Sequence, residues 1–482
     1  MIFMSINTHD YENDVRVMTG AFYPGEKIII DNSDECSLKV FVEVIDNHIK
    51  AKIITEGQEH LIDVWCENNT QGSIRNLLKR ELYKVYSVLT GKKLPWGTLT
   101  GIRPIKIPLA LVEQGLSDEE IISHFKAEYM VNDSKANLGL LVAHNEHKLL
   151  NQIDYKNGYS LYIGIPFCPT TCLYCSFTSY PISMWKDKVD LYLEGLFKEL
   201  TYLSDLLKSK KPDSIYIGGG TPTTLLPYQL EKLFDFLYEH FDVKNAKEFT
   251  VEAGRPDSID RDKLQVIKKY GIDRISVNPQ TMNQKTLDFI GRRHTVEDVH
   301  RAFKLARDCG FENINMDLIV GLPGETKSDV QYTLEEVAKL DPDSLTVHSL
   351  AIKRAAALNM FKDRYADCHI ENTDEIMDMT YDFAVSKGYE PYYLYRQKNM
   401  AGNLENVGYA KPSKAGIYNI LIMEEKQSIF AAGANSQSKI VFHDENRVER
   451  IENVKDVTNY IDRVDEMIER KRTFFHGKNE LR

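Results

Sequence analysis

Short runs of β-branched and aromatic residues alternate with amphipathic stretches of helical length through the middle of the chain. Six of these runs are typical of strands: residues 161–167, 214–219, 248–253, 274–280, 313–321 and 343–351. Apolar residues recur at helical spacing between most of them. Strands that alternate with helices indicate a parallel sheet with helices outside it. Six units are too few for a closed eight-stranded barrel, so we predict an α/β fold built on a partial (β/α)6 TIM-like barrel.

The first 150 residues and the last 120 follow other patterns. Four apolar runs between Lys27 and Trp65 are separated by turn-rich pieces and predict a small antiparallel sheet, and helical spacing predicts a helix over 73–89. Near the C-terminus we predict a helix over 373–386, strands at 417–423 and 428–436, and a helix over 454–472. We therefore expect an N-terminal accessory α+β domain over 1–150, the barrel over 151–362 and a C-terminal α+β cap over 363–482.

Polar and glycine-rich motifs follow the predicted strands of the barrel. They are FCPTTC, GGGTPT, EAGRPD, NPQT, MDLIVGLPG and HSLA, each at the end of one strand. The carboxyl ends of parallel strands meet at one edge of a sheet, and reactive residues of barrel enzymes lie there. The sequence therefore predicts a single catalytic mouth.

Composition and charge exclude several classes of protein. The chain has 482 residues and a formal net charge of −11, which argues against a general nucleic-acid binder. No apolar stretch is long enough for a membrane span, and the N-terminus lacks a signal pattern, so we expect a cytoplasmic protein. Seven cysteines form no disulfide framework of the secreted kind.

One segment departs from the acidic average. Residues 70–110 hold eight basic residues against one acid, Glu81, a local net charge of +7. The basic residues are Arg75, Lys79, Arg80, Lys84, Lys92, Lys93, Arg103 and Lys106. Such a segment fits an acidic redox partner, an RNA or the propionates of a tetrapyrrole, and it equally fits an ordinary solvated surface.

His144 and His147 lie one helical turn apart and fit either a metal or haem ligand pair or an ordinary helix.

Three of the seven cysteines lie within eight residues. Cys168, Cys172 and Cys175 have the spacing C-x3-C-x2-C on the loop after the first barrel strand. A close set of thiolates favours an iron–sulfur cluster or zinc. Structural zinc takes four protein ligands, so a zinc site would need a distant residue such as Cys309 or His348. Three thiolates on a 4Fe–4S cluster would instead leave one iron open to the amino and carboxylate groups of S-adenosylmethionine (SAM).

The cysteine spacing is the signature of the radical SAM superfamily, and the longer pattern LYIGIPFCPTTCLYCSF resembles its oxygen-independent coproporphyrinogen III oxidase group. The resemblance runs from about Tyr162 to Lys439 with its motifs in order. The extra N-terminal region and the TSYP after CSF are most similar to the HemZ branch of that group.

The resemblance implies a 4Fe–4S cluster on the three cysteines and a set of SAM contacts. The implied contacts are Tyr162, Gly219, Gly220, Thr221, Glu252, Gln280, Arg292, Asp317 and Ala351. The backbone of Gly218 to Thr221 would hold the methionyl end, and Tyr174 would stack on the adenine. Gly433, Asn435 and Ser436 resemble a small-residue loop near the nucleotide. The implied reaction is oxidative decarboxylation of coproporphyrinogen propionates through a 5′-deoxyadenosyl radical, with flavodoxin or ferredoxin as electron donor.

The sequence departs from the decarboxylating oxidases at three places. Phe177 stands where they have a further cysteine, Gly164 stands where many relatives have histidine, and the segment from Asn403 to Tyr409 lacks a histidine of the group's pattern. The first two changes leave open a haem chaperone or a radical methyltransferase that opens haem, whereas the third argues against a chaperone.

The aromatic run near residue 393 is the candidate substrate surface. Tyr392, Tyr393, Tyr395 and Arg396 suit stacking on a flat macrocycle and pairing with its propionates. The same run is equally typical of a buried strand whose tyrosines have partners in the core.

Overall fold

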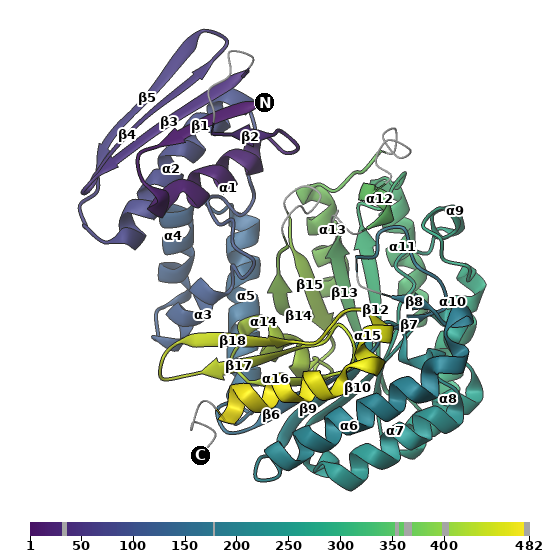
Figure 1. The fold of residues 1–482 in the computed structure, drawn as a ribbon. Helices are drawn as coiled ribbons and strands as arrows, with labels where there is room; N and C mark the ends of the chain where they lie inside the picture. The colour runs from purple at the N-terminus through teal and green to yellow at the C-terminus, as the bar shows by residue number, and fades with distance from the viewer. Residues whose placement is uncertain (31–35, 177–178, 352–355, 361–368, 398–403, 477–482) are drawn as a thin grey trace. The chain divides into compact units, whose positions relative to one another are not determined.

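The computed structural model describes residues 1–30, 36–176, 179–351, 356–360, 369–397 and 404–476. The chain forms two compact units, Met1–Ala143 and His144–Arg482 (Figure 1). The domain borders predicted from the sequence remain predictions, and helix α5 (Asp133–Leu150) crosses the point where the two units divide. No helix in the described part of the chain is long and apolar enough to cross a lipid bilayer.

The N-terminal unit is a five-stranded sheet with helices. Its strand order is β2-β1-β3-β4-β5, where β1 is Ile2–Ile6, β2 Ile28–Ile29, β3 Leu38–Ile45, β4 His48–Thr55 and β5 Gln58–Trp65. Alternate residues of β3 are buried against α1 (Glu12–Phe22) and α2 (Gln71–Thr90), as a half-buried strand requires. Helices α3 (Lys106–Glu113) and α4 (Asp118–Tyr129) complete this unit.

The predicted antiparallel pairing is confirmed for β3, β4 and β5 and is wrong for the first of the four runs, which is β2. Strand β1 pairs in parallel with both β2 and β3, so the sheet is mixed. The parallel pairs arise because β1 and α1, which the sequence reading did not include, precede the other strands and place β1 inside the sheet.

The second unit is built on an eleven-stranded sheet with the order β14-β15-β13-β12-β11-β10-β9-β6-β16-β17-β18. Its six parallel barrel strands are β6 (Tyr159–Ile165), β9 (Pro212–Gly219), β10 (Glu248–Gly254), β11 (Arg274–Val277), β12 (Asn313–Val320) and β13 (Ser344–Ser349). The order is linear among the described strands, so the predicted partial (β/α)6 barrel is confirmed.

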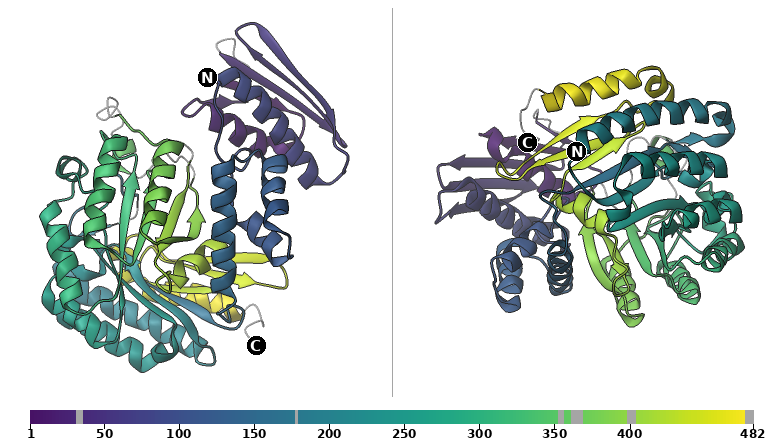
Figure 2. Two further views of the ribbon diagram at one scale, coloured as in Figure 1. Left: turned by 180° about the vertical axis from the view of Figure 1, so that it is seen from behind. Right: turned by 90° about the horizontal axis from the view of Figure 1, so that it is seen from below.

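Helices follow the barrel strands and lie on one side of the sheet (Figures 1 and 2). They are α6 (Val189–Leu207), α7 (Pro227–His240), α8 (Arg261–Lys269), α9 (Gln284–Phe289), α10 (Val296–Asp308), α11 (Lys327–Leu340), α12 (Ala357–Met360) and α13 (Asp374–Ser386). A two-stranded pair, β7 (Phe167–Cys168) with β8 (Tyr180–Pro181), flanks the cysteine loop.

C-terminal strands extend the barrel sheet at both edges. Strands β15 (Asn406–Ala410) and β14 (Glu390–Tyr395) continue it antiparallel beyond β13. At the other edge β16 (Ile429–Ala432) pairs in parallel with β6, followed by β17 (Gln437–Phe442) and β18 (Arg447–Glu452).

Two C-terminal predictions are wrong. The segment predicted as a strand at 417–423 is helix α14 (Ile417–Glu424), because a short apolar run has no period that separates a buried helix from a buried strand. The predicted single helix over 454–472 is two helices, α15 (Val457–Asp462) and α16 (Val464–His476).

Candidate functional site

The side of the barrel sheet away from its helices encloses a cavity of about 610 Å³. Residues of a strand alternate between the two faces, so every second side chain of the parallel strands points into this cavity. These inward side chains are polar or aromatic in most strands, and they include Tyr162, Tyr216, Glu252, Asn315, Asp317 and His348. A parallel sheet normally buries apolar residues on both faces. The polar inner face therefore indicates a binding site.

Cys168, Cys172 and Cys175 all line this cavity. The loop that carries them is held by backbone hydrogen bonds from the Cys175 N–H to the Cys172 carbonyl oxygen (3.1 Å) and from the Leu173 N–H to the Ile290 carbonyl oxygen (2.9 Å). Burial raises the pKa of the Cys168 thiol to about 11, although the Thr221 hydroxyl donates to its sulfur at 3.6 Å. Cys172 is buried and Cys168 and Cys175 are partly buried, and three thiols on one short loop are suited to binding a metal centre.

The donor set fits an iron–sulfur cluster better than a single ion. No group of three His, Cys, Asp or Glu side chains among the described residues is placed to hold one metal ion. Of the two candidate fourth ligands for zinc, Cys309 is the C-cap of α10 and does not line the cavity, and His348 has its Nε2 3.9 Å from Asp317. All-cysteine sets of this kind are typical of iron–sulfur clusters. Cys168, Cys172 and Cys175 would hold the cluster.

The glycine turn after β9 packs directly against the start of the cysteine loop. Gly219 has a φ of 104°, and a Cβ on Gly220 would lie 2.6 Å from the Phe167 carbonyl oxygen. The N–H groups of Gly220 and Thr221 donate to the Ile165 and Phe167 carbonyl oxygens, both at 2.7 Å. These two N–H groups are therefore occupied within the chain, and the contact of the Gly218 to Thr221 backbone with the methionyl end of SAM remains a prediction that would use the other backbone groups. The turn positions the cysteine loop.

Two carboxyl groups that face the cavity, those of Glu252 and Asp317, have pKa values shifted in opposite directions. Burial and the negative charge of Asp317 raise the pKa of Glu252 to about 7, against the lowering effect of a hydrogen bond donated by Tyr216. Burial also tends to raise the pKa of Asp317, but the nearby His348 and a hydrogen bond from Asn315 (2.8 Å) outweigh it and lower that pKa. A site whose acids have separated pKa values can hold one carboxyl protonated beside an ionised one.

Tyr162, Tyr216 and Tyr418 stack in this cavity. The rings of Tyr216 and Tyr418 are 4.4 Å apart, and Tyr162 lies 6.2 Å from each. Of the three, the sequence reading named only Tyr162. Helix α14 supplies Tyr418, so its misassignment as a strand hid this residue.

Gln280 and Arg292 both follow strand β11 along the chain. The Arg292 guanidinium donates to the Tyr174 hydroxyl (2.9 Å) and to the Asn278 carbonyl oxygen (2.6 Å), while its Nε has no partner among the described residues. Gln280 has a φ of 70°, and its buried side-chain oxygen also lacks a partner there. A positive φ at a residue other than glycine is uncommon and clusters at functional sites. Both atoms belong to side chains that line the cavity, so a polar ligand bound there would be close to them.

The aromatic run divides between two faces of β14. Tyr393 and Tyr395 line the cavity with their rings 6.1 Å apart, and the Tyr395 hydroxyl lies 3.3 Å from His348 Nδ1. Tyr392 and Arg396 do not line it. Tyr392 accepts a hydrogen bond from Asn419, and Arg396 is buried beside Glu405. The period of two along a strand separates the predicted group.

Of the other residues singled out in the sequence, some line the cavity and some do not. Ala351, Asn435, Ser436 and Gly164 line the cavity, and Gly433 does not. The Gly433 N–H instead donates to buried Glu199 at 2.9 Å. Phe177 and Asn403 lie outside the described residues.

Three of the eight basic residues in the segment 70–110 form ion pairs within the N-terminal unit. Arg75 pairs with Asp14 at 2.8 Å, Arg80 with Glu128, and Lys84 with Glu81 at 2.6 Å. The His147 ring contacts Asn151 at 3.2 Å. These contacts favour the ordinary interpretation of both features.

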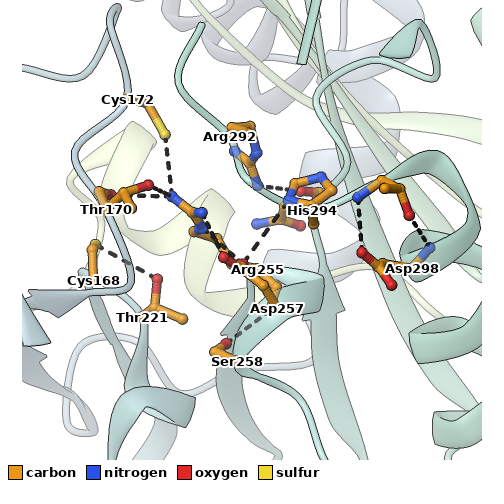
Figure 3. Close-up of polar contacts among 12 residues, drawn as sticks. Cys168, Thr170, Cys172, Thr221, Arg255, Asp257, Ser258, Arg292, His294 and Asp298 are labelled. Carbon is orange, nitrogen blue, oxygen red and sulfur yellow. Dashed lines mark hydrogen bonds and ion pairs between the residues drawn. The ribbon is translucent and has the colours of Figure 1, made fainter. Parts of the chain in front are cut away.

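The sequence reading missed Arg255, Asp257 and His294. In Figure 3 they lie on one side of the cysteine loop, and Arg255 contacts it, with its Nη1 2.7 Å from Thr170 Oγ1 and 3.8 Å from Cys172 Sγ. The motif EAGRPD placed Arg255 and Asp257 at a strand end, but nothing in the sequence showed what they contact.

Comparisons with known proteins place this chain in a family. Residues 162–337 match the family model of the radical SAM superfamily. The chain is 41% identical over 402 residues to an oxygen-independent coproporphyrinogen-III oxidase-like protein, HemZ, of Bacillus subtilis, covering 83% of this chain and 80% of the relative. It is 40% identical over 197 residues to the heme chaperone HemW of the same organism, covering 40% of this chain and 51% of that one.

The fold is also similar to a solved structure. The coproporphyrinogen III oxidase HemN of Escherichia coli, described as a radical SAM enzyme, superposes with a TM-score of 0.52 at 24% identity, over 67% of this chain and 73% of that chain. The chain therefore belongs to the radical SAM superfamily, and within it to the group of HemZ and the oxygen-independent coproporphyrinogen III oxidases.

Proposed function

We propose that the protein is a radical SAM enzyme that acts on a tetrapyrrole, with oxidative decarboxylation of coproporphyrinogen III propionates as the reaction. One observation carries the proposal. The three cysteines, Glu252, Gln280, Arg292 and Asp317 line one cavity together with Tyr393 and Tyr395. When bound, a 4Fe–4S cluster supplies the electron that cleaves SAM to methionine and a 5′-deoxyadenosyl radical.

The residues of the chain bind and orient the two substrates in this proposal. Arg292 suits the carboxylate of SAM, because a guanidinium pairs with a carboxylate through two N–H groups. Asp317, ionised by its low pKa, and Glu252 suit hydroxyl or ammonium donors. Tyr393 and Tyr395 offer ring faces for a macrocycle.

A specific comparison favours a second candidate, a haem chaperone. A relative named as a heme chaperone is 40% identical over 197 residues, nearly the identity of the HemZ match. Such a protein would bind haem at the same tyrosines and would not turn it over.

Products distinguish these candidates. The anaerobically reconstituted protein, with dithionite and SAM, is incubated with coproporphyrinogen III or with haem, and tetrapyrroles are measured by mass spectrometry. The proposal expects loss of carbon dioxide from coproporphyrinogen III. Haem that is bound and recovered unchanged, with coproporphyrinogen III also unchanged, would favour the chaperone, and a methylated, opened haem would favour a methyltransferase.

A further inference from the structure

Arg255 is a buried arginine that reaches the cysteine loop from the neighbouring strand. It directly follows β10, and its side chain is only 5% exposed. Its guanidinium lies between the cysteine loop on one side and Asp257 on the other (Figure 3). The plane of five N–H donors lets one side chain hold both at once.

Asp257 fixes the orientation of this guanidinium. Arg255 Nε donates to Asp257 Oδ1 at 2.9 Å and Nη2 to Oδ2 at 2.7 Å, so the pair is bidentate. Burial tends to raise the pKa of Asp257, but Arg255 outweighs it and lowers that pKa. An ionised, bidentate partner restricts the guanidinium to one plane and aims Nη1 at the cysteine loop.

Nη1 contacts the loop at its centre. It donates to Thr170 Oγ1 at 2.7 Å and to the Thr170 carbonyl oxygen at 3.1 Å, and it lies 3.8 Å from Cys172 Sγ. The Thr170 hydroxyl in turn donates to the Gly291 carbonyl oxygen at 3.0 Å. The segment between Cys168 and Cys172 is therefore tied both to β10 and to the loop before α10.

His294 lies near Asp257 but does not neutralise its negative charge, so Arg255 does. Both of its buried ring nitrogens lack a hydrogen-bond partner among the described residues, and Nδ1 lies 3.9 Å from Asp257. Burial and the positive charge of Arg292 lower the pKa of His294 to about 3, so the ring is neutral. Within the described part of the chain, Arg255 is thus the cation that pairs with Asp257.

We propose that Arg255, oriented by Asp257, is a positioning residue for the iron–sulfur cluster: it holds the segment from Cys168 to Cys172 in place and donates a hydrogen bond to the Cys172 sulfur when that sulfur is a cluster ligand. This inference rests on the proposed function. A donor or positive charge at a ligand sulfur stabilises the more negative, reduced cluster. Arg255 therefore raises the reduction potential of the cluster and makes it easier to load with an electron.

The test compares Arg255→Gln and Arg255→Lys with a matched control, Arg307→Gln. Arg307 also forms a partly buried ion pair, with Asp343 at 2.7 Å, but it does not line the cavity. Full-length protein is reconstituted anaerobically without SAM. Iron and sulfide per chain are then determined, and the midpoint potential of the cluster is measured by a redox titration followed by electron paramagnetic resonance.

We expect Arg255→Gln to hold less cluster and to shift its midpoint potential to a more negative value. Lysine keeps the charge but cannot contact Asp257 and the loop through one planar group, so Arg255→Lys should fall between Arg255→Gln and the wild type. Arg307→Gln should match the wild type.

A wild-type potential in both Arg255 variants would overturn the inference and leave the proposed function intact. If Arg255→Gln does not fold, Arg255→Lys alone decides, because the inference requires its potential to lie below that of the wild type. A wild-type protein that takes up no 4Fe–4S cluster would overturn the proposed function and the inference together.

Discussion

Replacing Glu252 by glutamine should stabilise the ligand-free protein at neutral and higher pH, although it changes a residue of the binding cavity. The pKa of Glu252 is raised from its ordinary value of 4.5 to about 7 by burial and by the charge of Asp317. At about 1.4 kcal/mol for each pKa unit, ionising this carboxyl costs the folded protein about 3 kcal/mol. Because the side chain faces the cavity, water there screens part of the charge, and we expect about 2 kcal/mol.

The sign follows from which state ionises first. The folded pKa lies above the unfolded one, so the unfolded chain loses its proton first as the pH rises. The wild type therefore loses stability between about pH 4.5 and pH 7 and is level above that, as far as this group is concerned. Glutamine has no proton to lose and still offers an oxygen to Tyr216. The gain from Glu252→Gln should be small at the acidic end and complete above neutral pH.

Urea unfolding followed by circular dichroism at several pH values between 5 and 8 measures this difference. Glu194→Gln, a change at an exposed position on α6, is the matched control and should leave the pH dependence unchanged. A gain that does not vary with pH, or a Glu252→Gln protein that is less stable than the wild type at pH 8, would refute the reasoning.

Two further predictions concern the support of the site. Gly220→Ala should lower cluster incorporation, because the new Cβ would lie 2.6 Å from a backbone carbonyl oxygen, whereas Gly72→Ala meets nothing within 4 Å and should not; equal iron content in both would contradict the close-contact argument. Lys471→Met should lower the free energy of unfolding by about 3–5 kcal/mol, because it leaves fully buried Glu199 without its 2.5 Å partner. The exposed pair of Lys198 is the control, and a Lys198→Met change should cost below about 1 kcal/mol. Equal losses in the two thermal unfolding curves would show that the buried pair is not special.

The barrel could be predicted from the sequence because its local patterns agree with its tertiary structure. Each β-branched run between amphipathic stretches became a parallel strand, and the polar motifs lie around one cavity. Prediction failed where local pattern carries no information. The run at 417–423 is apolar at nearly every position, so its pattern did not separate a strand from the helix that it forms. Strand β1 pairs in parallel with β3, and no hairpin turn in the sequence indicates such a pair.

Within the cavity, side chains at the strand ends were predictable from the sequence, whereas side chains that reach the cysteine loop from a neighbouring strand were not. Glu252 and Asp317 follow from their places in the motifs. The contact of Arg255 with the cysteine loop depends on how closely the end of β10 approaches Thr170, which no local sequence pattern shows. Tyr392 and Arg396 were grouped with the cavity tyrosines because the run was treated as one surface, whereas a strand presents alternate residues to opposite sides.

The formation of 5′-deoxyadenosine tests the central claim most directly, namely that Cys168, Cys172 and Cys175 hold a cluster that cleaves SAM in this cavity. Wild-type protein and Cys172→Ala are reconstituted anaerobically, supplied with dithionite and SAM, and analysed by liquid chromatography. We predict 5′-deoxyadenosine from the wild type and only background from Cys172→Ala. A fully assembled wild-type cluster that yields none, or a Cys172→Ala protein that yields as much as the wild type, would contradict the account.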